Sequence, residues 1–272
     1  MKIADIHSAL LQMLTWYHSF CKEHSLRYYV VGGTMLGAVR HRGFIPWDDD
    51  IDVGMPRKDY ESFVSIMNEK SYGKYVLETA GTGYNDFIYP FAKLYDTETT
   101  LIENLRHPIK RGIYIDIFPL DGIGNSETEA KKNYKAILNR INLLSMMTCA
   151  INNRRKWYKN VGIVMGRLVP PFITTPHKLI KNIDTLCKER DFYSSFVVGN
   201  LVGNWGYREL MKREFFGEPQ EYKFETITVH GVEKSDEYLR CLYGDYMKLP
   251  PSEKRASHHN YLFCSLDKSY VK

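Results

Sequence analysis

The chain opens with apolar residues at every third or fourth position, which predicts an amphipathic helix over residues 3–21. A short apolar run at 28–31 predicts a buried strand, and Gly32-Gly33 ends this strand before a helical turn over 34–39. The other elements predicted in this half are a helix over 57–68 and strands over 75–79, 87–95 and 113–118. Strands and helices therefore alternate up to residue 122, which is typical of an α/β fold with a mixed sheet.

The pattern changes beyond residue 125. Helical periodicity dominates from 126 to 216, where prolines at 170, 171 and 176 interrupt it. A strand over 226–229, a turn at 230–231 and a helix over 235–243 then precede a polar, irregular end. We therefore expect three regions: a catalytic core at 1–125, a basic helical region at 126–216 and a C-terminal segment at 217–272 that returns to the active site.

Charge is distributed unevenly along the chain. The whole sequence carries 37 Lys and Arg against 32 Asp and Glu, but residues 131–190 carry thirteen basic residues against Asp184 and Glu189. This segment is either a solvated helical face or a docking surface for an anionic acceptor or an anionic membrane leaflet. The apolar residues that would face such a membrane are Trp157, Val161, Ile163, Val164, Met165, Leu168 and Val169. No RNA-recognition motif accompanies the charge, so we expect no nucleic-acid partner.

The cysteines and the N-terminus indicate the compartment. The five cysteines are scattered and form no CxxC pair, which favours a reducing, cytoplasmic environment over a disulfide framework or a zinc site. The first residues lack the apolar core of a secretory signal, and no apolar run is long enough to cross a membrane.

The acidic run at 48–52 carries the first chemical signal. If Asp50 and Asp52 lie in a strand, their carboxylates share one face, about 7 Å apart at Cα. Carboxylate oxygens without neighbouring Cys or His favour Mg²⁺, with Mn²⁺ as the other candidate. A solvated turn is the structural alternative. An EF-hand calcium loop is excluded, because Val53 stands where that loop requires glycine.

Two further features favour a catalytic site. Gly32, Gly33 and Thr34 stand where a strand gives way to a helix, a place where backbone N–H groups can hold phosphate oxygens. Asp116 interrupts an apolar strand, so its carboxylate requires either a metal ion or a basic side chain as partner. A glycine turn, an Asp-x-Asp pair and a third strand aspartate are together typical of the nucleotidyltransferase fold.

Three motifs make the resemblance closer. Residues 31–52, VGGTMLGAVRHRGFIPWDDDID, strongly resemble the first signature of the LicD family of phosphocholine transferases. Residues 116–122, DIFPLDG, resemble its second signature, and YGDYM at 243–247 with LPP at 249–251 and the histidines at 258 and 259 resemble its C-terminal one. The cysteine zinc loop of the fukutin-related ribitol-phosphate transferases is absent, which places the sequence nearer the bacterial branch.

The resemblance implies an activity: metal-dependent transfer of phosphocholine from CDP-choline to a hydroxyl of a cell-surface glycan precursor, of the teichoic acid or lipopolysaccharide type, with release of CMP. Asp50, Asp52 and Asp116 would be catalytic, and with Asp48 they would hold the metal. Asp116 is also the candidate acceptor of the hydroxyl proton. Asp49 would face away from the other carboxylates. A glycan attached to a lipid would place the enzyme in the cytoplasm, at the inner face of the plasma membrane.

The resemblance also implies residues that bind substrate. The candidates are Gly32, Gly33, Thr34, Arg40, His41, Trp47, Lys93, Lys254, Arg255, His258 and His259. Trp47 is the candidate for an aromatic cage around choline, with packing of its loop as the alternative. Lys93 is either an anion ligand or a surface lysine, and the terminal histidines are either substrate ligands or solvated side chains.

Two other reactions suit the same acidic core. Transfer of glycerol phosphate or ribitol phosphate from a CDP-alditol would change only the small pocket, which would then form hydrogen bonds with a polyol. Nucleotidyl transfer to a small acceptor would release pyrophosphate from a nucleoside triphosphate. The donor that supports turnover distinguishes the three.

Overall fold

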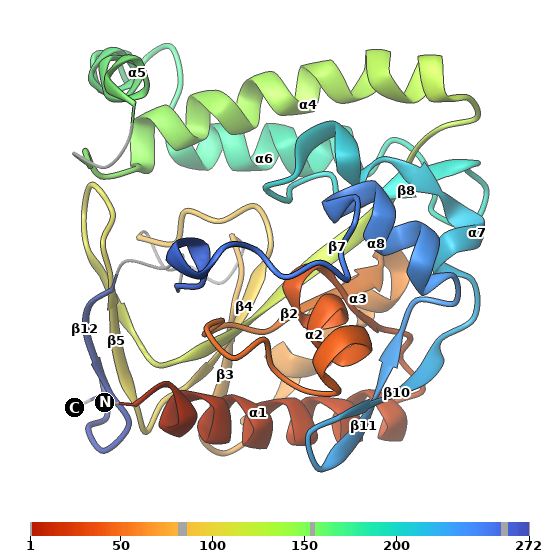
Figure 1. The fold of residues 1–272 in the computed structure, drawn as a ribbon. Coiled ribbons are helices and arrows are strands. Elements are labelled where there is room, and N and C mark those ends of the chain that lie inside the picture. Colours follow the sequence, from red (N-terminus) through yellow and green to blue (C-terminus); the bar gives the residue numbers. More distant parts are fainter. Residues whose placement is uncertain (1, 81–85, 153–155, 257–260, 272) are drawn as a thin grey trace.

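The computed structural model describes residues 2–80, 86–152, 156–256 and 261–271 (Figure 1). The helices in these ranges are α1 (Ile3–Glu23), α2 (Gly32–His41), α3 (Arg57–Glu69), α4 (Glu127–Thr148), α5 (Trp157–Arg167), α6 (Pro176–Cys187), α7 (Arg213–Phe216) and α8 (Ser235–Tyr243), with 3₁₀ turns η1 (Gly206–Glu209) and η2 (Ser252–Lys254). Within the described ranges, no helix combines the length and the hydropathy that crossing a membrane requires.

Twelve strands form two sheets in this part of the chain. They are β1 (Tyr29–Val30), β2 (Asp52–Pro56), β3 (Tyr75–Glu78), β4 (Ala92–Asp96), β5 (Thr100–Glu103), β6 (Ile109–Arg111), β7 (Tyr114–Gly124), β8 (Val197–Gly199), β9 (Met211–Lys212), β10 (Gln220–Phe224), β11 (Ile227–Gly231) and β12 (Tyr261–Ser265). The main sheet has the order β10-β11-β1-β2-β7-β4-β3, and β8 and β9 extend it along the end of β7. The small sheet has the order β12-β5-β6. This is the mixed α/β architecture that the sequence predicts.

Strand β7 lies in the interior of the main sheet. It pairs with β2 in parallel and with β4 in antiparallel fashion, and all eleven of its residues are buried. A strand covered on both faces tolerates a charged side chain only where a partner compensates it. The position of Asp116 on β7 is therefore chemically significant.

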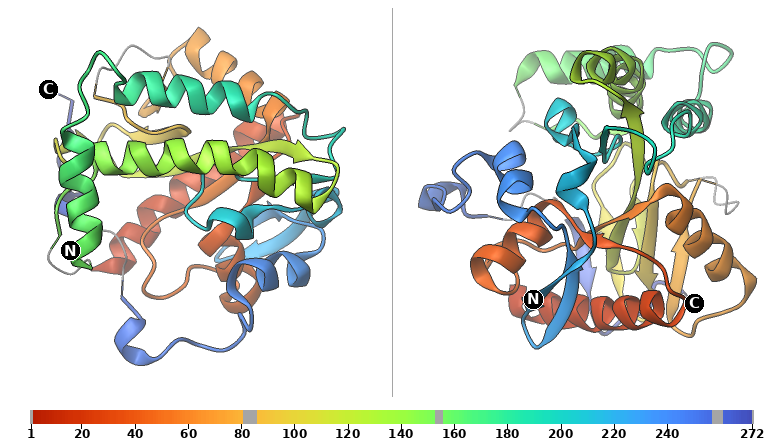
Figure 2. Two further views of the ribbon diagram at one scale, coloured as in Figure 1. Left: turned by 90° about the horizontal axis from the view of Figure 1, so that it is seen from above. Right: turned by 90° about the vertical axis from the view of Figure 1, so that its right-hand side faces the viewer.

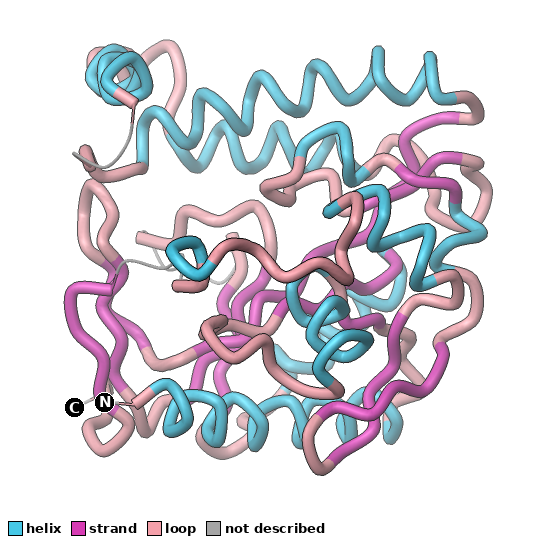
Figure 3. Tube along the Cα trace, in the orientation of Figure 1, coloured by secondary structure: helices cyan, strands magenta, loops and turns pink. Residues whose placement is uncertain are grey.

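Helices cover the sheet on two sides. Figure 1 shows α1 below the sheet and α4 with α6 above it, and Figure 3 shows the strands between these layers. Seen from above in Figure 2, α4 and α6 run side by side, and α5 crosses one end of α4. The buried positions of α1 follow the predicted helical period: Leu10, Met13, Leu14, Tyr17, Phe20 and Cys21.

Several predicted elements change in extent. The helix predicted at 34–39 begins at Gly32, the strand predicted at 87–95 begins at Ala92, and the turn predicted at 230–231 belongs to β11. The prediction of a helical region up to 216 is wrong in its last part, because β8 and β9 add to the sheet there. The chain end contains β12, not only irregular structure. These short strands are held by distant partners, so their own residues carry little periodic signal.

Candidate active site

Charged residues stand in one row across the middle of the main sheet. The strand register sets Asp52 of β2 beside Asp116 of β7, and Asp116 beside Lys93 of β4. Side chains of laterally paired residues project from the same face of a sheet, and neighbouring strands lie about 5 Å apart. The register therefore brings two carboxylates and one ammonium group together from segments that are far apart in the sequence.

Asp48 and Asp50 join this row from the loop that precedes β2. The strand begins only at Asp52, so the prediction that Asp50 lies in the same strand is wrong. Burial first, and then the charges of Asp50, Asp116 and Asp48, raise the pKa of the Asp52 carboxyl well above its usual range. The four carboxylates named as metal ligands thus form one acidic cluster around Asp52. Asp49 acts electrostatically on Tyr261 and Cys264 of β12 instead.

The donor chemistry of the acidic cluster fits a hard divalent cation. Carboxylate oxygens are the ligands that Mg²⁺ and Mn²⁺ prefer, and a bound cation would relieve the repulsion that raises the pKa of Asp52. As the side chains stand, no group of three or more His, Cys, Asp or Glu within the described ranges could hold a metal ion.

Lys93 is fully buried, which contradicts the alternative that it is a surface lysine. Its ammonium nitrogen Nζ lies 3.0 Å from Oδ1 of Asp116 and 3.2 Å from Oε1 of Glu103. Burial opposes the charged form, but Asp116 and Glu103 outweigh it and raise the pKa of Lys93. The pKa of Glu103 shifts the other way. Burial would raise it, but Lys93 and the hydroxyls of Tyr89 and Tyr114 lower it by a larger amount. Lys93 therefore stays cationic between the carboxyl groups of Glu103 and Asp116.

The start of α2 approaches the acidic cluster closely. A Cβ atom on Gly33 would lie 2.8 Å from Oδ2 of Asp48, so only glycine fits without displacing that carboxylate. Gly32 has a φ of +54° and donates its N–H to the hydroxyl of Tyr238. The hydroxyl of Thr34 accepts the N–H of Asp52 at 2.8 Å. The three residues thus set the helix N-terminus against the carboxylates, and phosphate contact by them stays a prediction.

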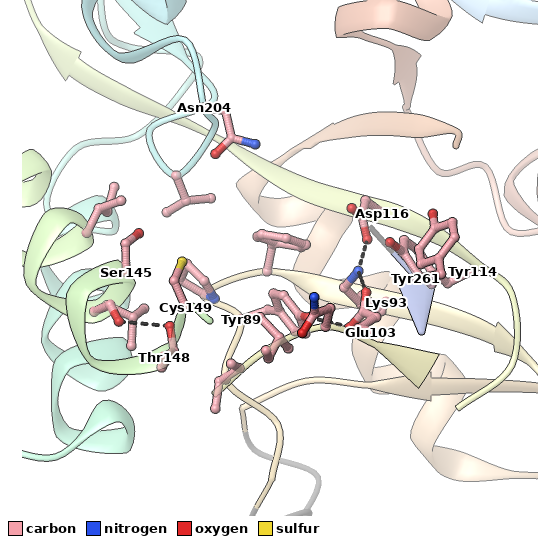
Figure 4. A pocket seen from close by; sticks show the side chains of 18 residues that line it. Tyr89, Lys93, Glu103, Tyr114, Asp116, Ser145, Thr148, Cys149, Asn204 and Tyr261 are labelled. Carbon is pink, nitrogen blue, oxygen red and sulfur yellow. Dashed lines mark hydrogen bonds and ion pairs between the residues drawn. The ribbon is translucent and has the colours of Figure 1, made fainter. Parts of the chain in front are cut away.

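One cavity, which we name the tyrosine pocket, lies between the sheets and α4 (Figure 4). Its volume is about 320 Å³. Figure 4 shows Lys93, Glu103, Asp116, Tyr114 and Tyr261 on one side of the pocket, Ser145 and Thr148 of α4 with Cys149 on the other, and Tyr89 between them. Its labelled lining residues are Tyr89, Lys93, Glu103, Tyr114, Asp116, Ser145, Thr148, Cys149, Asn204 and Tyr261. Nζ of Lys93 lies 3.3 Å from the centre of the Tyr114 ring and 4.4 Å from that of Tyr89, so this pocket already holds a cation against aromatic faces.

A second cavity, which we name the tryptophan pocket, has Asp48 of the acidic cluster in its lining. It has a volume of about 570 Å³. Its lining includes Gly33, Arg40, Trp47, Asp48, Trp205, Tyr243 and Lys254. Asp48 thus lines one cavity and Asp116 the other, so the acidic cluster contributes a carboxylate to each of two pockets.

Of the predicted basic ligands, Arg40 and Lys254 line the tryptophan pocket. Arg40 donates from Nε to Nε2 of His41 at 2.9 Å and from a guanidinium nitrogen to the carbonyl of Tyr246. Burial and the neighbouring Arg40 lower the pKa of His41. Arg255 stands over the ring of Trp47 at 5.7 Å, so that ring already faces a cation. His258 and His259 lie outside the described residues.

Sequence reasoning missed several side chains of the site. Glu103, Tyr89 and Tyr261 lie in the tyrosine pocket, but two of them belong to the small sheet, which was not predicted. Tyr114 had a signal, because it precedes Asp116 by two residues and therefore shares its face of the strand. Trp205, which precedes η1 and lines the tryptophan pocket, had no sequence signal that indicated a place in the site.

Glu209 makes the stability of the folded protein depend on pH. Burial raises its pKa to about 8, from 4.5 for the free side chain, so the folded protein keeps the carboxyl protonated at neutral pH. Between these two values the folded state binds more protons than the unfolded chain, and stability falls as pH rises. Glu209→Gln removes this titration. We expect its melting temperature to match the wild type at pH 5 and to exceed it by about 5 °C at pH 9. Equal melting curves at both pH values would contradict the assignment.

Comparison with known proteins identifies relatives of this sequence. Residues 25–139 match the family described as LicD/FKTN/FKRP, nucleotidyltransferase domain. The chain is 30% identical over 252 residues to the lipopolysaccharide cholinephosphotransferase LicD of Haemophilus influenzae, and the match covers 92% of each chain. An uncharacterised protein of Rickettsia typhi is 39% identical over 59 residues, which are 22% of this chain and 19% of that protein.

A shorter match connects the chain to an animal enzyme. The human ribitol 5-phosphate transferase FKRP is 50% identical over 34 residues, which are 12% of this chain and 7% of that protein. The family match includes the acidic motif and Asp116, and the similarity to the Haemophilus protein spans nearly the whole of both chains. On these grounds the chain belongs to the LicD family of phosphotransferases.

Proposed function

We propose that this protein transfers phosphocholine from CDP-choline to a hydroxyl of a glycan precursor of the lipopolysaccharide or teichoic acid type, and releases CMP. The observation that carries the proposal is that the acidic cluster contributes a carboxylate to each of the tyrosine and tryptophan pockets. A transferase needs this arrangement, because donor and acceptor must reach one phosphorus atom from different directions. The name of the Haemophilus relative supports choline and a lipopolysaccharide acceptor.

The tryptophan pocket is the proposed site of the nucleotide. Trp47, Trp205 and Tyr243 offer aromatic faces to a base, and Arg40 and Lys254 offer positive charge to the phosphates. The N-terminus of α2 adds its positive end at Gly33. Bound there, CDP-choline would point its diphosphate at the acidic cluster.

The tyrosine pocket is the proposed site of the acceptor hydroxyl. Asp116 lines it and accepts the hydroxyl proton as the oxygen attacks the phosphorus of phosphocholine. The bond from that phosphorus to the oxygen it shares with CMP breaks, and CMP leaves with the electron pair. Ser145 and Asn204 can form hydrogen bonds with sugar hydroxyls. The tyrosine rings of this pocket join Trp47 as candidates for contact with the trimethylammonium group.

Mg²⁺, with Mn²⁺ as the other candidate, is the proposed cofactor. Asp48, Asp50, Asp52 and Asp116 would hold the ion, which when bound supplies positive charge to the diphosphate. A lipid-linked acceptor would place the enzyme in the cytoplasm at the inner face of the membrane, and we propose no nucleic-acid partner.

CMP release tests the proposed function directly. The protein is incubated with CDP-choline, CDP-glycerol or CDP-ribitol, each with Mg²⁺ and again with EDTA, and CMP is measured by chromatography. We expect release from CDP-choline alone, and only with Mg²⁺. The match to the ribitol 5-phosphate transferase favours the CDP-alditols as the second candidate donors. Preference for an alditol would overturn the choline assignment, and release that persists in EDTA would overturn the metal.

A further inference from the structure

An unusual apolar surface lies around α5, which crosses one end of α4 (Figure 2). Nine of the seventeen large apolar side chains that are exposed in the described ranges fall between Ile151 and Ile173. They include Trp157 and Leu168, about three quarters exposed at 76% and 74%, and Phe172 at 83%. Soluble proteins rarely expose a contiguous apolar area of this kind unless it binds something. We name α5 and the following residues up to Ile173 the apolar face.

Helix α5 is held to the fold by its small residues. Gly166 packs directly on Met146 of α4, where a Cβ atom would lie only 2.5 Å from Cβ of Met146. Ile163 was predicted to face a membrane but is buried, as Gly166 is, so that part of the prediction is wrong. Tyr158, Phe172 and Ile173 take the exposed positions that the sequence prediction omitted. The helix therefore turns Ile163 and Gly166 inward and most of its large apolar side chains outward.

A cavity opens beside the apolar face. We name it the arginine pocket; its volume is about 560 Å³. Its basic lining residues are Arg106, His107, Arg167 and His177, and its apolar walls include Val169 and Pro171. Asp86, the carboxylate in the lining, is paired with Arg111 at 2.7 Å. Ile88 and Thr148 line both this cavity and the tyrosine pocket, so the two are neighbours.

We propose that the apolar face docks on an anionic lipid bilayer and that the arginine pocket binds the phosphate of a lipid there. Charge favours lipid over a second copy of the chain, because residues 151–173, which contain the apolar face, carry five basic residues and no acidic ones. Two copies would bring two such segments together, whereas an anionic leaflet complements them. Trp157 and flanking Lys156 and Lys159 are the residue types that lie at a membrane interface.

The assignment also places the acceptor relative to Asp116. Because Ile88 and Thr148 line both the arginine pocket and the tyrosine pocket, a lipid phosphate in the arginine pocket would hold the attached glycan next to the tyrosine pocket, which Asp116 lines. The nucleotide would occupy the tryptophan pocket, which shares no lining residue with the other two cavities. This inference rests on the proposed function only for the identity of the acceptor, since lipid binding itself requires no catalysis.

Vesicle sedimentation tests the docking surface. The full chain is mixed with vesicles of phosphatidylcholine, with or without phosphatidylglycerol, and the sedimented fraction is measured. We expect binding to the anionic vesicles only, and at least about ten-fold weaker binding for Leu168→Ser/Phe172→Ser, because both side chains would leave the bilayer. The matched control is Phe196→Ser/Val271→Ser, which removes two comparably apolar, exposed side chains outside this segment and should bind as the wild type does.

A second pair of variants tests the arginine pocket. Arg106→Gln/His177→Gln should lower the affinity for phosphatidylglycerol vesicles about five-fold or more, whereas Lys70→Gln/Lys223→Gln, also exposed, should change it less than two-fold. Equal binding to both kinds of vesicle, or unchanged binding of the Leu168/Phe172 variant, overturns the proposal. CMP release is measured without vesicles in the same preparations. Vesicle binding by a protein that releases no CMP would refute the proposed function and leave the docking surface standing.

Discussion

Asp52→Asn is expected to lower CMP release from CDP-choline by about 10²–10³-fold and yet to raise the melting temperature. The side chain keeps its shape but loses the charge that burial, Asp50, Asp116 and Asp48 all oppose in the folded protein. Removing one of four mutually repelling carboxylates relieves that repulsion, so the fold gains stability as the reaction loses a ligand for its cation. Active sites are the places where proteins retain such unfavourable charge.

Asp49→Asn is the matched control for this variant. It makes the same chemical change within the same acidic run, but Asp49 acts on Tyr261 and Cys264 instead of Asp52. We expect the control to keep CMP release within about three-fold of the wild type. Comparable losses of CMP release in the two variants would show that the acidic run supports the fold, or the electrostatic field of the site, as a whole. That result would contradict a specific role for Asp52.

The acidic cluster was predictable from the sequence because its members carry local signals. Asp48, Asp50 and Asp52 stand in one short run, and Asp116 stands out against the apolar residues of its strand. The helices α1, α3 and α8 were predictable for the same reason, since each has a clear apolar period or end signals of its own.

The partners of these residues were harder to predict, because they depend on strand pairing over long distances in the chain. Glu103 lies on β5, whose four residues are held by β6 and by β12 from the chain end. Nothing near residue 103 reveals that its carboxylate meets Lys93 and compensates the buried charge. The sequence therefore left two interpretations of Lys93, and the fold decides between them through the register of β4 and β7.

That register leads to the second prediction, for Lys93→Met. The variant keeps the length and apolar stem of the side chain but leaves Glu103 and Asp116 without the cation between them. Removing one member of a buried ion pair costs about 3–5 kcal/mol of unfolding free energy. The loss should be largest at pH 7 and smaller at pH 5. Without the cation, burial raises the pKa of Glu103. Its carboxylate is therefore protonated, and its charge lost, as the pH falls. Urea unfolding at the two pH values measures both effects.

A double variant separates the structural role of Lys93 from its role in the site. Lys93→Met/Glu103→Gln removes one of the two unpaired carboxylates, so it should regain part of the stability that the single variant loses. CMP release should remain at least about ten-fold below the wild type, because Asp116 still lacks the ammonium group, 3.0 Å away, that orients it. Glu103→Gln alone leaves Asp116 and Lys93 paired and should retain most of the activity. Full activity in the double variant would show that Lys93 serves only as the counter-ion of Glu103. Recovery of stability without recovery of activity would show that Lys93 also positions Asp116.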